Sequence, residues 1–231
     1  MSLGAQITIV IPTLDEAPWI RGTLAALQPL REQGHDVIVV DGGSADGTAD
    51  LAQPLADRVI SAPRGRASQM NAGAAEARGD VLVFLHADTL LPPRADDLVL
   101  QGLALSRLLW GRFDVRIAGR HPLLPVVAWL MNLRSRATGI ATGDHAIFIW
   151  REVFLRAGGF PSIPIMEDIA LSRALVRKTP PLCLAERVTT SGRRWEAHGV
   201  LRTIARMWWL RLRFYLGASP ERLAELYGAQ R

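Results

Sequence analysis

Short apolar runs near the start of the chain constrain its fold more than any other feature. They occupy residues 7–11, 36–41, 58–61 and 80–86, and every residue of the first run is β-branched. Helical stretches separate them, from Pro18 to about Gln28 and from Ala67 to Arg78, with Gly79 as a stop. Strands alternating with helices predict an α/β fold with a Rossmann-like, mostly parallel sheet flanked by helices.

The second half of the chain is less regular. We expect strands near residues 146–150 and 182–187, a helix over 167–177, and a further helix opened by Pro92 and Pro93. A long helix is predicted over 196–216, ended by Gly217, with a short final helix after Pro220. Because no repeat or linker divides the 231 residues, we expect one domain over 1–231.

The predicted C-terminal helix is amphipathic. Arg202, Arg206 and Arg213 share one side of it. An apolar stripe on the other side consists of Leu201, Ile204, Trp208, Leu212 and Tyr215. We favour packing of this helix on the core with its basic face in solvent. The alternative is peripheral contact with an anionic membrane, where Trp and Arg mark the interface.

The charge and the apolar stretches bound the setting of the protein. The net charge is +5, and nearly all of the positively charged residues are arginines. This excess of arginine reflects either genome composition or attraction to anions. The single Cys183 excludes an intrachain disulfide and suggests an inert buried thiol. The start lacks a secretory signal, and the apolar stretch 122–133 is shorter than the roughly 20 residues that span a bilayer. We expect a cytoplasmic protein, at the inner face of the cell membrane if the C-terminal helix binds lipid.

Polar residues follow each predicted strand of the first half. They include Thr13 and Glu16, then Asp41, then Arg64 and Arg66, and finally His86 and Asp88. Carboxyl ends of parallel strands meet at one edge, where such sheets bind ligands. This set of residues suits a nucleoside diphosphate. Aspartates can bind a base or ribose, arginines can pair with phosphate, and a carboxylate can hold a hard cation. Neither a P-loop nor a dinucleotide-binding G-x-G-x-x-G is present.

Motifs in this half, taken together, resemble a known family. They are I-V-I-P-T-L-D-E at 9–16, V-V-D-G-G-S-A-D-G-T at 39–48, R-G-R at 64–66 continuing to N-A-G at 71–73, and F-L-H-A-D at 84–88. In order and spacing they resemble family 2 glycosyltransferases with the GT-A fold. The resemblance implies a nucleotide-binding half at 1–90, an acceptor and catalytic half at 91–195, and C-terminal helices at 196–231.

The same resemblance assigns donor-site roles. Pro12, Thr13, Glu16 and Asp41 would line the base and ribose pocket. Arg66 would contact the nucleotide, and Asp88 would bind Mg²⁺ or Mn²⁺. The sequence departs from the family pattern twice: Gly42 follows Asp41 where a second aspartate is usual, and His86 replaces the first aspartate of D-x-D. Because imidazole is a poorer ligand than carboxylate for a hard cation, His86 is instead expected to bind ribose or phosphate, or to favour Mn²⁺.

The second half carries a predicted catalytic pair. Gly143-Asp144-His145 and Gly158-Gly159-Phe160 precede Glu167 and Asp168. In the family such a glycine-rich segment leads to an E-D pair whose aspartate is the general base, so the resemblance implies that Asp168 deprotonates the acceptor, with Glu167 beside it. One base facing the anomeric carbon suits inverting transfer. The alternative is that both residues only cap the following helix.

A second basic motif lies at residues 191–195, Ser-Gly-Arg-Arg-Trp, and resembles the Q-x-x-R-W element of processive members with serine in place of glutamine. Arg194 would neutralise the leaving diphosphate, and Trp195 would stack on the acceptor. A basic surface turn with a packed tryptophan is the alternative. His198 is a further candidate metal ligand or a structural histidine. Because no membrane-spanning helix is predicted, we expect single transfers.

These observations predict an inverting glycosyltransferase with a nucleoside-diphosphate-sugar donor, expected to be a UDP-sugar, and an unknown small-molecule or lipid-linked acceptor. The chain resembles a small bacterial subgroup, some of whose members are assigned to arsenosugar biosynthesis. The alternative is a non-catalytic nucleotide- or nucleic-acid-binding module. No nucleic-acid motif supports it, and we expect no nucleic-acid partner. A nucleotidyltransferase would need a lysine-bearing phosphate loop, which is absent.

Overall fold

The β-branched run at the start of the chain forms β1 (Ile7–Thr13), whose side chains are almost all buried. In the computed structural model, which describes residues 4–228, β1 lies between β2 (Asp36–Asp41) and β4 (Val81–Phe84) and is parallel to both. The short β3 (Arg58–Ser61) extends the parallel part beyond β2. The predicted strands of the first half are confirmed. Residues 1–3 and 229–231 of the predicted domain lie outside the described residues.

The second half turns the sheet into a mixed one. β7 (Phe148–Trp150) is antiparallel to β4, and β6 (Trp110–Ala118) is antiparallel to β7. β8 (Leu182–Ser191) runs parallel to β6, and the two-residue β5 (Thr89–Leu90) closes the edge. Within residues 4–228 the strand order is β3-β2-β1-β4-β7-β6-β8-β5.

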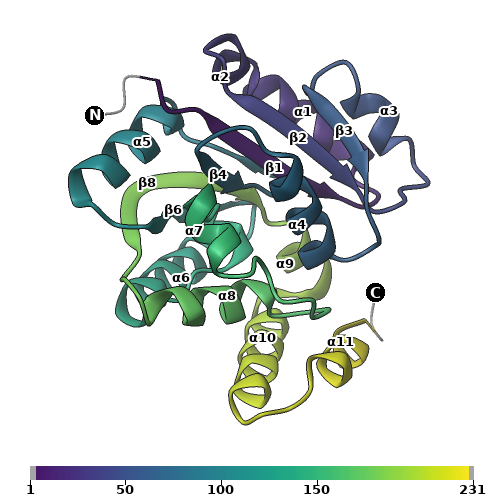
Figure 1. Cartoon of the computed structure of the whole chain (residues 1–231). Helices are drawn as coiled ribbons and strands as arrows, with labels where there is room; N and C mark the ends of the chain where they lie inside the picture. Colours follow the sequence, from purple (N-terminus) through teal and green to yellow (C-terminus); the bar gives the residue numbers. More distant parts are fainter. Residues whose placement is uncertain (1–3, 229–231) are drawn as a thin grey trace.

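Helices cover both faces of this sheet (Figure 1). The first half contributes α1 (Ala17–Ala26), α2 (Gln28–Glu32), α3 (Thr48–Ala52), α4 (Arg66–Glu76) and α5 (Ala95–Ser106). The second half contributes α6 (Leu124–Thr138), the 3-10 turn η1 (Gly143–His145), α7 (Arg151–Arg156), α8 (Glu167–Val176), α9 (Arg193–His198), α10 (Val200–Tyr215) and α11 (Pro220–Gly228). In Figure 1, α6, α8, α10 and α11 lie at the lower end of the molecule.

Two apolar clusters hold these layers together. One face of β1 and β2 packs through Ile9, Ile11 and Val39 against α1, α5 and α6. The other face packs through Val10 and Val40 against α4, α7 and α8. Alternation along the strands sends neighbouring side chains to opposite faces. Burial on both faces explains why these strands are continuous apolar runs.

Several predicted elements differ from the structure. The stretch 122–133, interrupted by Pro125, is part of α6, because proline is tolerated in the first turn of a helix. Gly79 does not cap α4, which ends at an extended Ala77; a Cβ on Gly79 would lie 2.6 Å from the backbone nitrogen of Thr8, so its role is close packing on β1. Cys183 is half-buried rather than buried. Strand β6 and helix α7 were not predicted.

The predicted long C-terminal helix over 196–216 is wrong in two respects. It is divided at Gly199, whose φ of 81° favours glycine, into α9 and α10. Its apolar stripe is also mostly exposed, with Trp208 67% and Leu212 57% exposed, although Ile204 packs against the large core cluster. The buried side chains of α10 are instead Val200, Thr203 and Leu210.

The C-terminal helices pack on α8 through Leu210 and Leu223, which contact Met166 and Ile169 in a third small cluster. Across residues 4–228, none of the helices combines the length and the apolar character needed to cross a bilayer. The exposed apolar stripe of α10 therefore faces outward from the domain without belonging to a membrane span.

Candidate functional site

A cavity of about 1090 Å³ opens at the carboxyl edge of the first strands and continues between α6, α8 and α10. Predicted site residues from the first half that line it are Pro12, Thr13, Glu16, Arg66, His86 and Asp88. Those from the second half are Glu167, Asp168, Arg194, Trp195 and His198. The fold thus brings together side chains separated by nearly the whole chain. Asp41 is the one predicted site residue that is not among the lining residues.

The Asp41 carboxylate instead organises the loop after β2. It accepts hydrogen bonds from the backbone N–H groups of Gly43 and Ser44, both at 2.9 Å, and from the hydroxyls of Ser44 and Thr13. Burial alone would raise the pKa of Asp41, but these hydrogen bonds outweigh it and lower the pKa. Asp41 therefore stays ionised and shapes the cavity wall at Thr13.

Two carboxylates at the donor end face one arginine. Arg193, at the start of α9, donates to both oxygens of Glu16 at 2.6 and 2.7 Å. Its Nε lies 3.1 Å from Asp88 Oδ2, and its guanidinium lies 5.4 Å from the ring centroid of Trp19. Arg193 thus joins the loop after β1 to the D-x-D strand end. The sequence prediction had singled out its neighbour Arg194.

His86, at the D-x-D position, contacts the second half of the chain. Its Nδ1 lies 3.4 Å from Asp144 Oδ1. Desolvation acts to raise the pKa of Asp144, but the His86 hydrogen bond and the charges of His86 and Arg66 hold it well below its usual range. A Cβ on Gly143 would collide with the His86 ring, so glycine is required for this close approach. His86 therefore connects the donor end to the η1 turn.

Asp168 lies in the first turn of α8. It accepts the Gly143 N–H at 2.8 Å through Oδ2 and the Ile169 N–H at 2.7 Å through Oδ1. Burial raises the pKa of Asp168, and the negative charge of Asp144 raises it further. These two hydrogen bonds and the positive charge of Arg66 act in the opposite direction but do not outweigh the increase. A carboxylate that is held in place and made more basic is well suited to accept a proton.

Glu167 is 4% exposed beside Asp168. Burial and the neighbouring Asp168 charge raise the pKa of Glu167 to about 7, although Arg66 opposes them. In turn, desolvation disfavours the Arg66 charge, but Glu167 and other nearby anions outweigh it and raise the pKa of Arg66. Met166, just before the pair, has a φ of 69°, a strained conformation for a non-glycine residue that is typical of functional sites.

The raised pKa of Glu167 predicts a pH-dependent stability. Folding shifts this pKa from 4.5 to about 7, so the stabilisation is present below pH 4.5 and is lost as pH rises through about 7. Glu167→Gln should reduce the fall in unfolding free energy between about pH 5 and about pH 8 by about 1–3 kcal/mol, measured by urea denaturation. Glu152→Gln, at an exposed site on α7, should leave it unchanged. If the unfolding free energy depends on pH equally in wild type and in Glu167→Gln, the raised pKa of Glu167 is contradicted.

The basic motif at 191–195 lies partly on the cavity and partly against the core. Arg194 lines the cavity and lies 5.4 Å from the ring centroid of Tyr227 on α11. Trp195 lines the cavity and packs against the large core cluster. His198 is exposed at the end of α9. α9 thus places two arginines on the cavity, Arg193 at the carboxylates and Arg194 beside α11.

A divalent cation fits the donor end only when shared with a ligand. No group of three His, Cys, Asp or Glu side chains suited to a metal occurs within residues 4–228. However, Mg²⁺ is typically held by one or two carboxylates together with substrate phosphates. Asp88 offers one carboxylate, and the Arg193 guanidinium already places a positive charge beside it. Asp88 would hold a divalent cation together with the phosphates of a bound ligand, and Arg193 would have to release Asp88 first.

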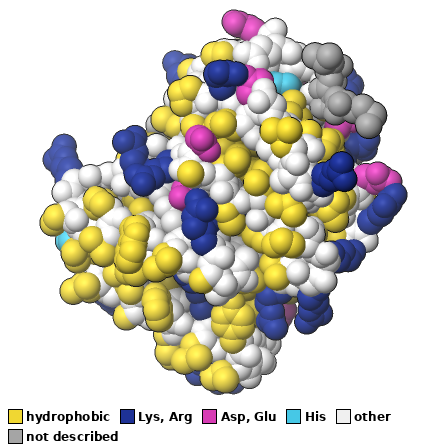
Figure 2. All heavy atoms as spheres, turned by 90° about the vertical axis from the view of Figure 1, so that its left-hand side faces the viewer, with side chains coloured by type: hydrophobic (Ala, Val, Ile, Leu, Met, Phe, Trp, Pro, Cys, Tyr) yellow, Lys and Arg dark blue, Asp and Glu magenta, His cyan; other side chains and the backbone are white. Residues whose placement is uncertain are grey.

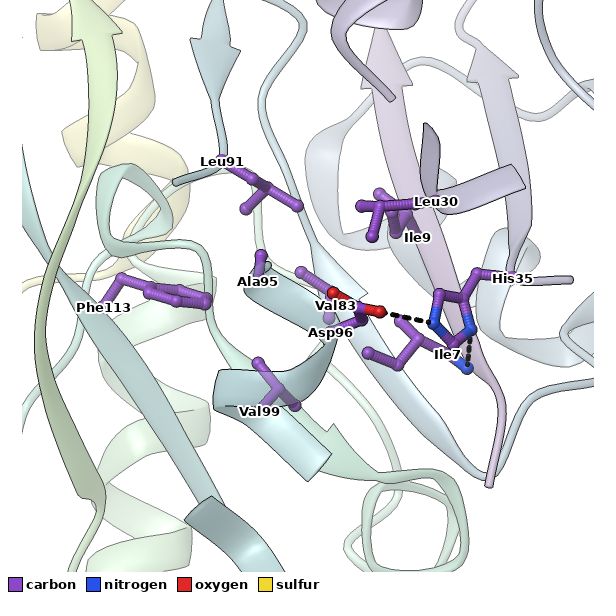
Figure 3. Close-up of a pocket in the computed structure, with 10 residues that line it drawn as sticks. All are labelled: Ile7, Ile9, Leu30, His35, Val83, Leu91, Ala95, Asp96, Val99 and Phe113. Carbon is purple, nitrogen blue, oxygen red and sulfur yellow. Dashed lines mark hydrogen bonds and ion pairs between the residues drawn. The ribbon is translucent and has the colours of Figure 1, made fainter. Parts of the chain in front are cut away.

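A second cavity lies beneath the sheet and is too small for a substrate (Figure 3). Its volume is about 10 Å³, close to that of one water. The His35 side chain crosses it, accepting the Ile7 N–H at 3.3 Å through Nδ1, with Nε2 3.3 Å from Asp96 Oδ2. Because Nδ1 accepts a hydrogen bond, the proton of neutral His35 lies on Nε2, facing Asp96. This pair joins β2 to α5 and is structural.

Some cavity residues were not predicted from the sequence. Arg193 and Asp144 lie inside predicted motifs, so the motifs pointed to the segments but not to these side chains. Arg134 on α6 and Arg211 on α10 lie outside every motif and reach the cavity only through helix packing. The only sequence signal for these two arginines was the helical spacing of residues in α6 and α10. That spacing does not show which face of a helix lines a cavity.

Comparison with known sequences finds a family whose model covers the part of this site that the first half of the chain contributes. The sequence model described as "Glycosyl transferase family 2" matches residues 8–128. A curated relative, the undecaprenyl-phosphate 4-deoxy-4-formamido-L-arabinose transferase of Pseudomonas fluorescens strain Pf0-1, is 26% identical over 160 residues, which are 62% of this chain and 45% of the relative. The chain therefore spans about half the length of the curated relatives it matches.

Solved structures share the fold. The mannosyltransferase PcManGT from Pyrobaculum calidifontis, in complex with GDP-Man and Mn²⁺, matches with a TM-score of 0.61 at 24% identity, over 80% of this chain and 56% of that one. Glucosyl-3-phosphoglycerate synthase from Mycobacterium tuberculosis, in complex with Mn²⁺, UDP and glucosyl-3-phosphoglycerate, matches with a TM-score of 0.57 at 22% identity, over 81% and 71%. These likenesses establish the architecture of the sheet.

Proposed function

Since the chain belongs to glycosyl transferase family 2 and has a GT-A fold, we propose that it is an inverting enzyme that transfers a sugar from a nucleoside-diphosphate-sugar donor. The proposed donor is a UDP-sugar. The observation that carries the proposal is the single cavity that contains both the strand-end residues and the Glu167–Asp168 pair. A nucleoside diphosphate at the strand ends would point its sugar toward the pair.

Asp168 is the proposed general base. Its two oxygens are positioned by the N–H groups of Gly143 and Ile169, and its raised pKa favours proton uptake. In the proposed step Asp168 takes the proton of an acceptor hydroxyl, whose oxygen bonds to the anomeric carbon. The bond from that carbon to the diphosphate oxygen breaks, and the electron pair leaves with the diphosphate. Attack opposite the leaving group inverts the configuration.

The cationic residues stabilise the leaving group in this proposal. Arg66 and Arg194 line the cavity and present guanidinium groups suited to phosphate oxygens. Asp88 would hold Mg²⁺ or Mn²⁺, with His198 as a further candidate ligand, and the metal would neutralise charge on the diphosphate. Arg193 would have to exchange its contact with Asp88 for one with the ligand. Pro12, Thr13 and Glu16 would line the base and ribose pocket, with Asp41 shaping it from behind.

The donor is identified by a thermal-shift screen of nucleoside-diphosphate sugars with Mn²⁺ or Mg²⁺. We expect a UDP-sugar near 100 times its Kd to raise Tm by roughly 5–10 °C with metal and by much less with EDTA. Asp88→Asn should remove the metal-dependent part, and the exposed Asp97→Asn on α5 should not. Release of nucleoside diphosphate should follow the same metal dependence. A protein that binds nucleic acid but no nucleotide sugar would overturn the proposal in favour of a binding module.

Peripheral contact with an anionic membrane is part of the proposed function. It is supported by the exposed apolar stripe of α10, where Leu201, Trp208 and Leu212 are accessible beside Arg202. A lipid-linked acceptor suits this surface, and the curated Pseudomonas relative is named for an undecaprenyl-phosphate acceptor. The vesicle arm of the acceptor experiment below tests this contact. Assignment to the arsenosugar subgroup also stays a proposal, supported by the His86-Ala87-Asp88 variant and the Arg-Arg-Trp segment.

A further inference from the structure

The cavity wall that α6 and α10 form contains two arginines that the proposed transfer does not use. Arg134 on α6 and Arg211 on α10 both line the cavity. Nε and Nη2 of Arg134 and Nε of Arg211 are shielded from solvent and have no hydrogen-bond partner among the described residues. Donors shielded without partners are costly, so these side chains are suited to an acceptor group that the described residues do not supply.

The charge balance at this wall favours an anion. Burial lowers the pKa of Arg134, and the nearby positive charge of Arg112 lowers it further, while Asp168 and Asp144 raise it. Arg134 is therefore close enough to Asp168 to respond to its charge, and its own charge is only partly compensated. An anionic group between Arg134 and Arg211 would supply the missing hydrogen bonds and lie beside the proposed base.

The walls around the two arginines are apolar. α6 contributes Val127, Leu130 and Leu133 to the lining, and α10 contributes Ile204, Met207 and Trp208. On the outside, Trp129 is 60% exposed on α6 and continues this apolar surface. Figure 2 shows hydrophobic side chains gathered at the lower end of one face of the molecule. Two charged side chains set among apolar walls match a ligand that combines an anionic group with an apolar chain.

Resting on the proposed glycosyltransferase function, we propose that Arg134 and Arg211 form the acceptor subsite, which binds the anionic group of an amphiphilic acceptor whose apolar chain leaves between α6 and α10. The shared chemistry is a phosphate on an apolar chain. In this proposal the phosphate binds at the wall formed by α6 and α10, and the nucleoside diphosphate binds at the strand ends with Asp88. This subsite also explains why the apolar stripe of α10 is exposed, because the acceptor would reach the cavity from a lipid surface.

Decyl phosphate, below its micelle concentration, is the probe, and calorimetric titration is the measurement. We expect binding to wild type, weakened at least about tenfold in Arg134→Gln and in Arg211→Gln, with Arg134→Lys intermediate because it keeps the charge but loses the fork geometry. Arg213→Gln, on the same helix, should bind within about twofold of wild type. Inorganic phosphate and uncharged decyl maltoside should each bind at least about tenfold more weakly than decyl phosphate.

Donor binding, measured as the thermal shift with UDP and Mn²⁺, separates the two proposals. Unchanged UDP binding in the arginine variants with weakened decyl phosphate binding supports the acceptor subsite. Decyl phosphate binding that is equal in wild type and both variants overturns the subsite, even if UDP still binds. If wild type does not bind UDP, only the proposed donor function is overturned, because decyl phosphate binding reports on Arg134 and Arg211 directly.

Vesicles distinguish the source of the anion. We expect wild type to co-sediment with phosphatidylglycerol vesicles and not with phosphatidylcholine vesicles, because the surface combines apolar and cationic groups. Inorganic phosphate that binds as tightly as decyl phosphate, together with no co-sedimentation at moderate salt, would identify a water-soluble anion as the occupant. That result would overturn the amphiphilic acceptor and the membrane contact together.

Discussion

Asp168→Asn is expected to lower turnover by about 10²–10⁴-fold while leaving the affinity for the nucleotide sugar largely unchanged. Asparagine has nearly the same shape and can still accept one of the N–H groups that position Asp168, from Gly143 or Ile169. It cannot take up the proton of the acceptor. The measurement is the rate of nucleoside-diphosphate release at saturating donor and acceptor, with donor affinity determined separately by thermal shift.

The matched control for this prediction is Asp97→Asn. Asp97 also lies in the first turn of a helix, α5, but is exposed, and its partners Arg94 and Gln101 lie at the surface. It should retain wild-type turnover. If Asp168→Asn also retains full turnover, Asp168 is not the base, and its hydrogen bonds would then serve only to fix α8 against the η1 turn.

Asp114→Asn is expected to destabilise the fold by about 3–5 kcal/mol, because it leaves a buried arginine without its counter-charge. Arg112 on β6 is 0% exposed and forms an ion pair with Asp114. Asp114 also pairs with Arg136 of α6 at 3.0 Å, so the carboxylate joins β6 to α6. Urea denaturation measures the free energy of unfolding, and the midpoint should fall with little change in slope.

Two further variants separate this effect from ordinary loss of an ion pair. Asp97→Asn removes an exposed pair with Arg94 and should cost no more than about 1 kcal/mol. The double variant Arg112→Met with Asp114→Asn should be more stable than Asp114→Asn alone, because it removes the uncompensated charge. A single Asp114→Asn variant as stable as wild type would show that solvent reaches Arg112.

The parallel half of the sheet was predictable because its signal is local. Each strand of the first half is a continuous apolar run followed by polar residues, and burial on both faces produces that pattern directly. The site residues of this half follow from the same rule, because parallel strands end at a common edge. Thr13, Glu16, Arg66, His86 and Asp88 accordingly line one cavity.

The second half was less predictable because its elements depend on partners. β6 alternates charged and apolar residues, and its Arg112 and Asp114 are buried only because they pair with each other and with α6. A single sequence gives no sign of that pairing. The break at Gly199 was missed for a related reason: glycine inside a helical pattern is tolerated, and only the packing of α9 on the cavity required the left-handed backbone there.

By itself, the sequence determined where the strands of the first half lie along the chain and which residues follow them, because period and burial act over a few residues. Only the tertiary structure decided which side chains face each other across the cavity. Arg193 contacts Glu16 and Asp88 across a separation of more than one hundred residues, and the α10 stripe is exposed because Leu210, on another face, packs against α8. These contacts depend on how the faces of whole helices and strands pack against each other, and no local sequence pattern specifies that packing.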